Sequence, residues 1–281
     1  MKFPTKLIFL IFLSFSSANL MAAKLNDVTI IVSSCDKYAP LWNPFFTSLF
    51  KNWPSLLDQN QEVPILLISN TKSFDNARIK HVHIPQEKSW SDNMLAALTK
   101  VQTKYVLVML DDYWLINPVQ EQRISDIVQA MQQEEIAMAQ LAYNNSSFHY
   151  GTKHPVLHDA IYTNQYAEYK TSLQAAIWEV KALRFLLKPG ESPWDFELAG
   201  TKRSHGYPAT FINIASNYPI EYLNAARQGY VEQFALDYAL ENGIKFERGN
   251  LPLIDKYKFN VTYANLKKRI SRLITRIKVY V

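Results

Sequence analysis

Two adjacent carboxylates, Asp111 and Asp112, directly follow an apolar run, Tyr105–Leu110, without a turn residue between. Continuous hydrophobicity is typical of a strand buried on both faces, as in a parallel sheet. Acids at the end of such a strand need a cation, hydrogen-bond donors or a helix end. Ligands bind beyond the carboxyl ends of the strands in open α/β sheets, so we expect a site for a divalent metal and a diphosphate here. The alternative is a solvated strand end at which Asp112 caps the next segment.

The segments around this strand predict strands that alternate with helices. Apolar runs predict strands at Val28–Ser33, Val63–Ile68, Lys80–Ile84 and Ile136–Leu141, and apolar spacing predicts helices at Leu41–Trp53, Met94–Val101 and Glu121–Gln133. Farther on, we expect a strand at Tyr169–Trp178, a helix at Glu179–Leu187, a short helix from Trp194 and a last helix at Val231–Glu241. This order indicates an α/β fold with a mostly parallel sheet flanked by helices.

Size and glycine content narrow the class of protein. A chain of 281 residues can form one large α/β domain with a full core. Its first glycine is Gly151, whereas dinucleotide folds and P-loops need several glycines in the first strand–helix turn. The sequence therefore disfavours a Rossmann dehydrogenase, a P-loop kinase and a nucleotidylyltransferase with a glycine-rich first loop. The single cysteine, Cys35, suits a reducing compartment.

The two ends of the chain are basic, although its body is slightly acidic. Lys2 and Lys6 precede an apolar run, so residues 1–23 are expected to be signal-like, with an anchor or an extension before a true start at Met21 as alternatives. Residues 24–258 are expected to form the domain. Residues 259–281 predict a basic amphipathic helix that lies on an anionic membrane or packs on its own domain. Without eight basic residues at these ends, the net charge of +5 becomes about −3, so no nucleic-acid partner is expected.

From about Val28 to Leu253, this order of elements and the Asp-Asp pair resemble the nucleotide-diphospho-sugar glycosyltransferases of the GT-A fold. The segments WSDN (90–93), VLVMLDDYW (106–114), SLQAAIW (172–178) and LLKPGESPWDFE (186–197) are also similar to a group of bacterial glycosyltransferase-like proteins. The resemblance implies a GT-A-like fold and a hexosyltransferase-type enzyme, inverting, with a nucleotide-sugar donor. Its acceptor would be a glycan or a lipid-linked glycan in surface polysaccharide synthesis.

The resemblance also implies a metal cofactor, Mn²⁺ or Mg²⁺, which acts as a Lewis acid for the departing diphosphate. Hard cations take oxygen ligands, which aspartate supplies. Because neighbouring residues on an extended chain point opposite ways, we expect Asp112 on the metal and Asp111 toward the ribose or a metal-bound water. The family pattern is usually Asp-x-Asp, and Tyr113 occupies the third position here. A non-catalytic nucleotide- or glycan-binding protein with a degenerate transferase fold is therefore the alternative.

Further site residues follow from this topology and resemblance. The nucleotide is expected across the first strand ends and a neighbouring helix start, at Ser33, Ser34, Asp36, Asn70, Asp92 and Asn93. The ordinary alternative at that helix start is a Ser or Asp cap. The base is expected at Asp195 or Glu197, and the sugar or acceptor at Trp194 and Gln174, with Lys202, Arg203 and His205 as auxiliary phosphate or metal contacts. The alternative for the two acids is a favourable interaction with the helix dipole.

Location follows from the donor, because sugar nucleotides are made in the cytosol. We therefore expect the protein at the cytoplasmic face of the inner membrane, held there peripherally or by its N-terminus.

Overall fold

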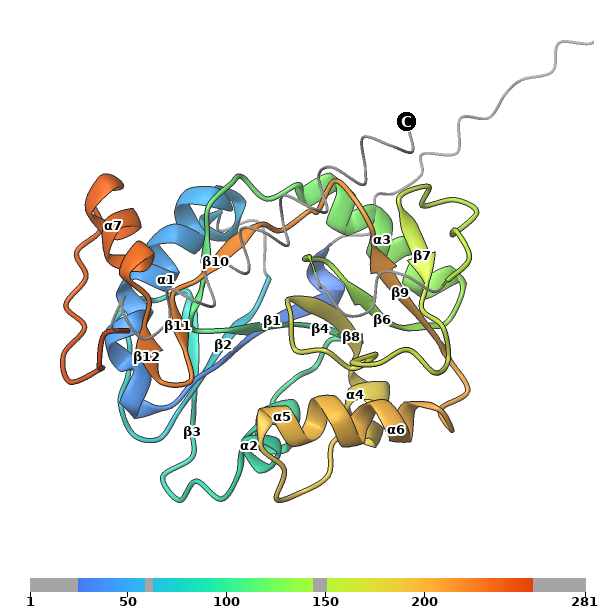
Figure 1. Cartoon of the computed structure of the whole chain (residues 1–281), viewed down its shortest axis with the longest axis horizontal. Helices are drawn as coiled ribbons and strands as arrows, with labels where there is room; N and C mark the ends of the chain where they lie inside the picture. The colour runs from blue at the N-terminus through green and yellow to red at the C-terminus, as the bar shows by residue number, and fades with distance from the viewer. Residues whose placement is uncertain (1–24, 59–62, 144–150, 255–281) are drawn as a thin grey trace, which may run out of the picture.

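The computed structural model describes residues 25–58, 63–143 and 151–254 (Figure 1). The expected N-terminal segment, 1–23, and tail helix, 259–281, lie outside the described residues. None of the helices in the described part of the chain combines the length and apolar character needed to cross a membrane.

Within these residues, eight strands form one sheet in the order β3-β2-β1-β4-β8-β6-β9-β7. Their bounds are β1 Val28–Ser33, β2 Ile65–Ser69, β3 Ile79–His83, β4 Tyr105–Leu110, β6 Ile136–Gln140, β7 Ala160–Tyr162, β8 Ala176–Glu179 and β9 Thr210–Ile214. Strands β3, β2, β1 and β4 run parallel, as do β6 and β9, whereas β8 and β7 are antiparallel to their neighbours. The predicted α/β class with a mostly parallel sheet is confirmed.

Helices cover both faces of the sheet, which explains the unbroken apolar runs. Alternate side chains of β4 enter different cores. Leu107 belongs to the core that includes residues of α1 (Ala39–Asn52), α3 (Glu121–Gln133) and α7 (Gln233–Glu241), whereas Val108 belongs to the core that includes residues of α2 (Trp90–Leu98) and α4 (Val180–Leu186). Figure 1 shows α1, α3 and α7 above the sheet and α2, α4, α5 and α6 below it. The helices are α1 Ala39–Asn52, α2 Trp90–Leu98, α3 Glu121–Gln133, α4 Val180–Leu186 and α7 Gln233–Glu241, with short 3₁₀ turns at Leu25–Asp27, Asp36–Tyr38 and Pro54–Leu57. Each fully buried Leu, Ile or Val side chain contributes about 1.5–3 kcal/mol.

One helix in the second half of the chain is irregular. It runs through α5, Pro193–Asp195, a π-helical turn, Phe196–Gly200, and α6, Thr201–Ser204. It is longer than the helix expected from Trp194. A π turn of this kind is frequent at functional sites because it changes which side chains face inward.

Two small antiparallel strand pairs lie outside the main sheet. Strand β5, Tyr113–Leu115, pairs with β10, Tyr222–Asn224. Strand β11, Ala226–Arg227, pairs with β12, Tyr230–Val231. Gln228 and Gly229, with φ of 52° and 84°, form the two-residue turn of this hairpin, a geometry that matches the twist of the paired strands.

Candidate active site

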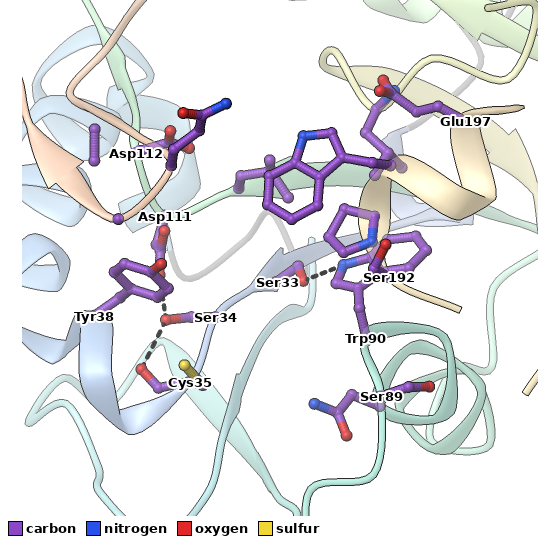
Figure 2. Close-up of a pocket in the computed structure, with 18 of the residues that line it drawn as sticks. Ser33, Ser34, Cys35, Tyr38, Ser89, Trp90, Asp111, Asp112, Ser192 and Glu197 are labelled. Carbon is purple, nitrogen blue, oxygen red and sulfur yellow. Dashed lines mark hydrogen bonds between the residues drawn. The ribbon is translucent and has the colours of Figure 1, made fainter. Parts of the chain in front are cut away.

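A cavity of about 940 Å³ lies at the carboxyl ends of β1 and β4. Predicted site residues that line it are Ser33, Ser34, Asn93, Asp111, Asp112, Gln174, Trp194, Asp195 and Glu197. Figure 2 shows the aspartate pair on one side of the cavity, with Ser192 and Glu197 on the other. The ends of β1 and β4, the start of α2 and the α5 helix, which are distant in the sequence, therefore meet at one cavity.

Asp111 is held at the base of the cavity by a serine that is itself oriented by an indole. The Ser34 hydroxyl donates a hydrogen bond to Asp111 Oδ2, and Trp42 Nε1 donates to Ser34 Oγ at 2.7 Å. Asp111 is 6% exposed. Burial, and to a lesser extent the charge of Asp112, raises the pKa of Asp111 well above its usual range, although the Ser34 hydrogen bond opposes this shift.

Asp112 differs from its neighbour because one carboxylate oxygen lacks a protein partner. Within the described part of the chain, Asp112 Oδ1 is buried and has no hydrogen-bond donor. Burial raises the pKa of Asp112 to about 7. The Asp112 backbone is fixed, because its carbonyl accepts a hydrogen bond from Ala225 N at 2.7 Å. A buried anionic oxygen without a donor is costly, and a cation would offset that cost.

The aspartate pair fits a hard divalent cation that is shared with a substrate. The described residues contain no group of three or more His, Cys, Asp or Glu side chains arranged to hold a metal by themselves. Mg²⁺ commonly binds through one or two carboxylates, with substrate phosphates and waters supplying the other ligands. Asp112, with its unpartnered oxygen, and the neighbouring Asp111 supply the oxygen chemistry for this arrangement.

Tyr113, at the third position of the motif, has a structural role. Its ring stacks on Tyr222 with centroids 4.2 Å apart, and its hydroxyl donates to the Leu173 carbonyl at 3.1 Å. The Tyr222 hydroxyl in turn donates to Gln174 Oε1 at 2.5 Å. The two tyrosines therefore fix the loop that brings Gln174 to the cavity wall.

The two candidate base residues have different environments. Asp195 is exposed and belongs to a capping box, since its Oδ2 accepts hydrogen bonds from the Ser192 hydroxyl at 2.6 Å and the Ser192 N–H at 3.1 Å. Glu197 is half-buried, and its Oε1 accepts from Leu173 N at 2.8 Å. Burial raises the pKa of Glu197, whereas the Ser192 hydrogen bonds lower that of Asp195. A carboxylate with a raised pKa is the better proton acceptor.

Three residues expected at the nucleotide lie outside the lining of this cavity: Asp36, Asn70 and Asp92. Asp36 joins the loops after β1 and β2, because its carboxylate accepts hydrogen bonds from the backbone N–H groups of Asn70 and Thr71. Asn70 Oδ1 accepts from the Asp36 N–H at 2.9 Å. Asp92 accepts from Ser89 and from Gly190 N in the cap of α2, as the capping alternative predicted. These side chains position loops instead of facing the cavity.

Arg203 and His205, which were expected as auxiliary phosphate or metal contacts, lie outside the lining of this cavity. Arg203 forms a two-pronged ion pair with Glu191, at 2.6 and 2.7 Å, and this pair fixes the loop before α5. His205 lines a different cavity. Neither side chain is therefore placed to contact a ligand held by the aspartate pair.

Sequence reasoning missed several residues of the cavity wall. Two of them are Trp90, whose Nε1 donates to Ser33 Oγ at 3.0 Å, and Glu87, whose Oε1 accepts from Asn93 Nδ2 at 3.0 Å. The β11–β12 hairpin adds Arg227 to the lining. The WSDN segment gave a signal for Trp90, but the hairpin lies more than a hundred residues from the aspartates, so no local pattern indicates it.

No family model and no curated protein matches the sequence. Among solved structures, the chain is similar to S. aureus TarS 1-349, with a TM-score of 0.49, 11% identity, and coverage of 70% of this chain and 60% of that one. A complex of TarS 1-349 with UDP-GlcNAc gives a TM-score of 0.46 and 10% identity, with coverage of 73% and 60%. CMP:2-keto-3-deoxy-manno-octonic acid synthetase complexed with CTP gives 0.42 and 12%, with coverage of 66% and 88%. The match thus spans about 60% of the TarS 1-349 chain, and at these identities the similarity concerns the fold alone.

Proposed function

We propose that this protein is a glycosyltransferase that moves a sugar from a nucleoside-diphosphate donor to a glycan or lipid-linked glycan acceptor. The observation that carries the proposal is one cavity at the carboxyl edge, in which the half-buried Asp112, one of whose carboxylate oxygens has no hydrogen-bond partner among the described residues, lies across from Glu197. TarS, a protein of similar fold, has been solved with UDP and with UDP-GlcNAc. Surface polysaccharide synthesis is the pathway we assign to the product.

The aspartate pair would hold a divalent cation, Mn²⁺ or Mg²⁺, together with the diphosphate. When bound, such a cation supplies Lewis-acid stabilisation of the departing diphosphate. The protein's own part is to orient Asp111 through Ser34 and to leave Asp112 Oδ1 without a hydrogen-bond donor from the described residues. Ser33 and Asn93 line the same cavity and would contact the nucleotide.

Glu197 is the base that the geometry favours for an inverting displacement. Its carboxylate is half-buried, has a raised pKa and lines the cavity, whereas both Ser192 contacts draw Asp195 into a helix cap. Trp194, 59% exposed at the cavity, provides an aromatic face for an acceptor sugar, and Gln174 provides a fixed amide. Asp195 then acts by holding the start of the helix that carries Glu197.

A thermal-shift screen of nucleoside diphosphates with and without Mn²⁺ tests donor binding. A ligand at about 100 times its Kd stabilises the folded state by about 2.7 kcal/mol. At about 2–4 °C per kcal/mol for a chain of this size, the melting temperature should rise by roughly 5–10 °C, and the rise should require the metal. A panel of diphosphates that leaves the melting temperature unchanged would refute the proposal.

A second function, a non-catalytic nucleotide- or glycan-binding protein, is favoured by one observation. Tyr113 stands where the usual pattern has its second aspartate, and it is buried against Tyr222. Hydrolysis of nucleotide sugars separates the two functions. Metal-dependent release of nucleoside diphosphate that is lost in Asp112→Ala supports the enzyme, whereas metal-dependent binding without release supports the binding protein.

The cytoplasmic face of the inner membrane is the location that the proposed donor requires, because sugar nucleotides are made in the cytosol. An anionic membrane surface would be contacted through residues 259–281, whose sequence carries six basic residues between Lys267 and Lys278. Mass spectrometry of the native protein tests this proposal. A processed N-terminus together with a periplasmic location would overturn it.

A further inference from the structure

A second cavity, of about 470 Å³, contains a buried lysine that the proposed reaction does not use. It is lined by residues that follow β7 and by the segment between α6 and β9, and it shares no lining residue with the larger cavity. Lys170 is 5% exposed and lines it. Lysine is almost never this deeply buried unless it is paired.

Among the described residues, the Lys170 ammonium has an aromatic neighbour but no anionic one. Its Nζ lies 4.2 Å from the centroid of the Phe211 ring. Within the described part of the chain, no carboxylate pairs with Lys170 and no acceptor takes its hydrogens. A ring face only partly offsets the loss of water around a cation. Burial accordingly lowers the pKa of Lys170.

Two further polar atoms of the same lining also lack partners. His205 Nε2 and Thr163 Oγ1 are buried without a hydrogen bond to any described residue. Buried polar groups are normally satisfied, and here three residues that line one cavity, Lys170, Thr163 and His205, carry polar groups without a hydrogen-bond partner among the described residues. The rest of the lining includes Phe211 and Tyr207, whose rings provide apolar surface.

We propose that this second cavity binds the anionic group of a small molecule, a carboxylate or a phosphate, through Lys170 with the help of Thr163 and His205. The ammonium and the Thr163 hydroxyl donate to the anion, and His205 Nε2 donates in the tautomer that places its proton there. A bound anion also restores the pKa of Lys170 toward its ordinary value. The volume is adequate for an anionic monosaccharide. The site is independent of the proposed donor site.

Isothermal titration calorimetry with inorganic phosphate, with glucuronate and with neutral glucose tests this site. Binding of either anion, without binding of glucose, is the expected result, and the anion that binds identifies its chemistry as phosphate or carboxylate. Loss of a charge-assisted hydrogen bond in Lys170→Met should weaken binding by about 10- to 100-fold. Lys181→Met, at an exposed lysine on α4 outside the lining of both cavities, is the matched control and should bind normally.

Thr163→Val is a second variant that tests the same site if Lys170→Met does not fold. It is close to isosteric and removes a hydroxyl that has no hydrogen-bond partner among the described residues. It should leave the melting temperature unchanged or higher while weakening anion binding by about two- to tenfold. The proposal is overturned if neither anion binds the wild-type protein, if glucose binds equally well, or if binding is unchanged in both Lys170→Met and Thr163→Val.

Discussion

Replacing Asp112 by asparagine should stabilise the metal-free protein at neutral and alkaline pH. Burial raises the pKa of Asp112 from its ordinary value of 3.8 to about 7. A carboxyl group whose pKa is higher in the folded than in the unfolded protein makes its full contribution to the stability of the fold at pH values below its pKa in the unfolded protein. That stability is lost as the pH rises from about 4 to about 7. Asparagine has no proton to lose, so the variant should escape this loss.

The magnitude follows from the difference between the two pKa values. A change from 3.8 to about 7 corresponds to about 4 kcal/mol. Asp112 is half-buried, and its partial exposure to water reduces this figure to about 2 kcal/mol. At pH 8 the Asp112→Asn variant should therefore melt about 4–8 °C above the wild-type protein. At pH 4 the two proteins should melt at similar temperatures.

The assay is thermal melting between pH 4 and 8, with and without Mn²⁺. Mn²⁺ should raise the melting temperature of the wild-type protein at pH 8 and leave Asp112→Asn unchanged, because a cation offsets the buried charge only where the carboxylate is present. Asp126→Asn, at an exposed acid on α3, is the control and should follow the wild type. An Asp112→Asn variant that melts at or below the wild-type temperature at pH 8 would refute this reasoning.

Three other predictions concern the loops, the base and the cavity wall. Hydrogen bonds from Thr71, Lys72 and Asn70 outweigh desolvation and lower the pKa of Asp36 to about 2. The Asp36 carboxylate therefore stabilises the folded protein above about pH 4, and this stabilisation is lost between about pH 4 and 2. Urea unfolding of Asp36→Asn should show a loss of about 1–2 kcal/mol at pH 7, and equal stability at pH 7 would contradict this. Glu197→Gln should lower the transfer rate at least about 100-fold. Asp195→Asn changes a helix cap, so it should lower the stability by about 1 kcal/mol and the transfer rate by less than tenfold. A larger loss of rate in Asp195→Asn than in Glu197→Gln would assign the base to Asp195. Tyr222→Phe removes the hydrogen bond to Gln174 and should raise KM for the acceptor more than it lowers kcat. Steady-state kinetics would measure both values. An unchanged KM would show that Gln174 does not contribute to acceptor binding.

The sequence predicted the central elements well where hydrophobic runs are continuous. Strands at Val28–Ser33 and Tyr105–Leu110 and the helix at Glu121–Gln133 have the predicted bounds. The expected strand at Tyr169–Trp178 is correct only for its last residues, because β8 spans Ala176–Glu179. The residues before β8 are fixed instead by tertiary contacts, such as that between Leu173 N and Glu197, which no local pattern contains.

The candidate site was predictable only in part for the same physical reason. Asp111 and Asp112 were found because charge interrupts an apolar strand, and that signal is local. Asp36 also lies just after an apolar strand, yet its carboxylate accepts hydrogen bonds from backbone N–H groups of the loop after β2. Which acid is satisfied by loops and which keeps an unpartnered oxygen depends on contacts between segments distant in sequence, so only the structure separates them.

A crystal structure of the protein with UDP and Mn²⁺, recorded at a wavelength where manganese scatters anomalously, tests the central claim most directly. The claim predicts an anomalous peak about 2.2 Å from an Asp112 carboxylate oxygen, a distance typical of small divalent cations, with the diphosphate bound to the same ion inside the cavity beside Ser33 and Ser34. Manganese and nucleotide bound elsewhere, or a nucleotide in the cavity without an ion at Asp112, would contradict it.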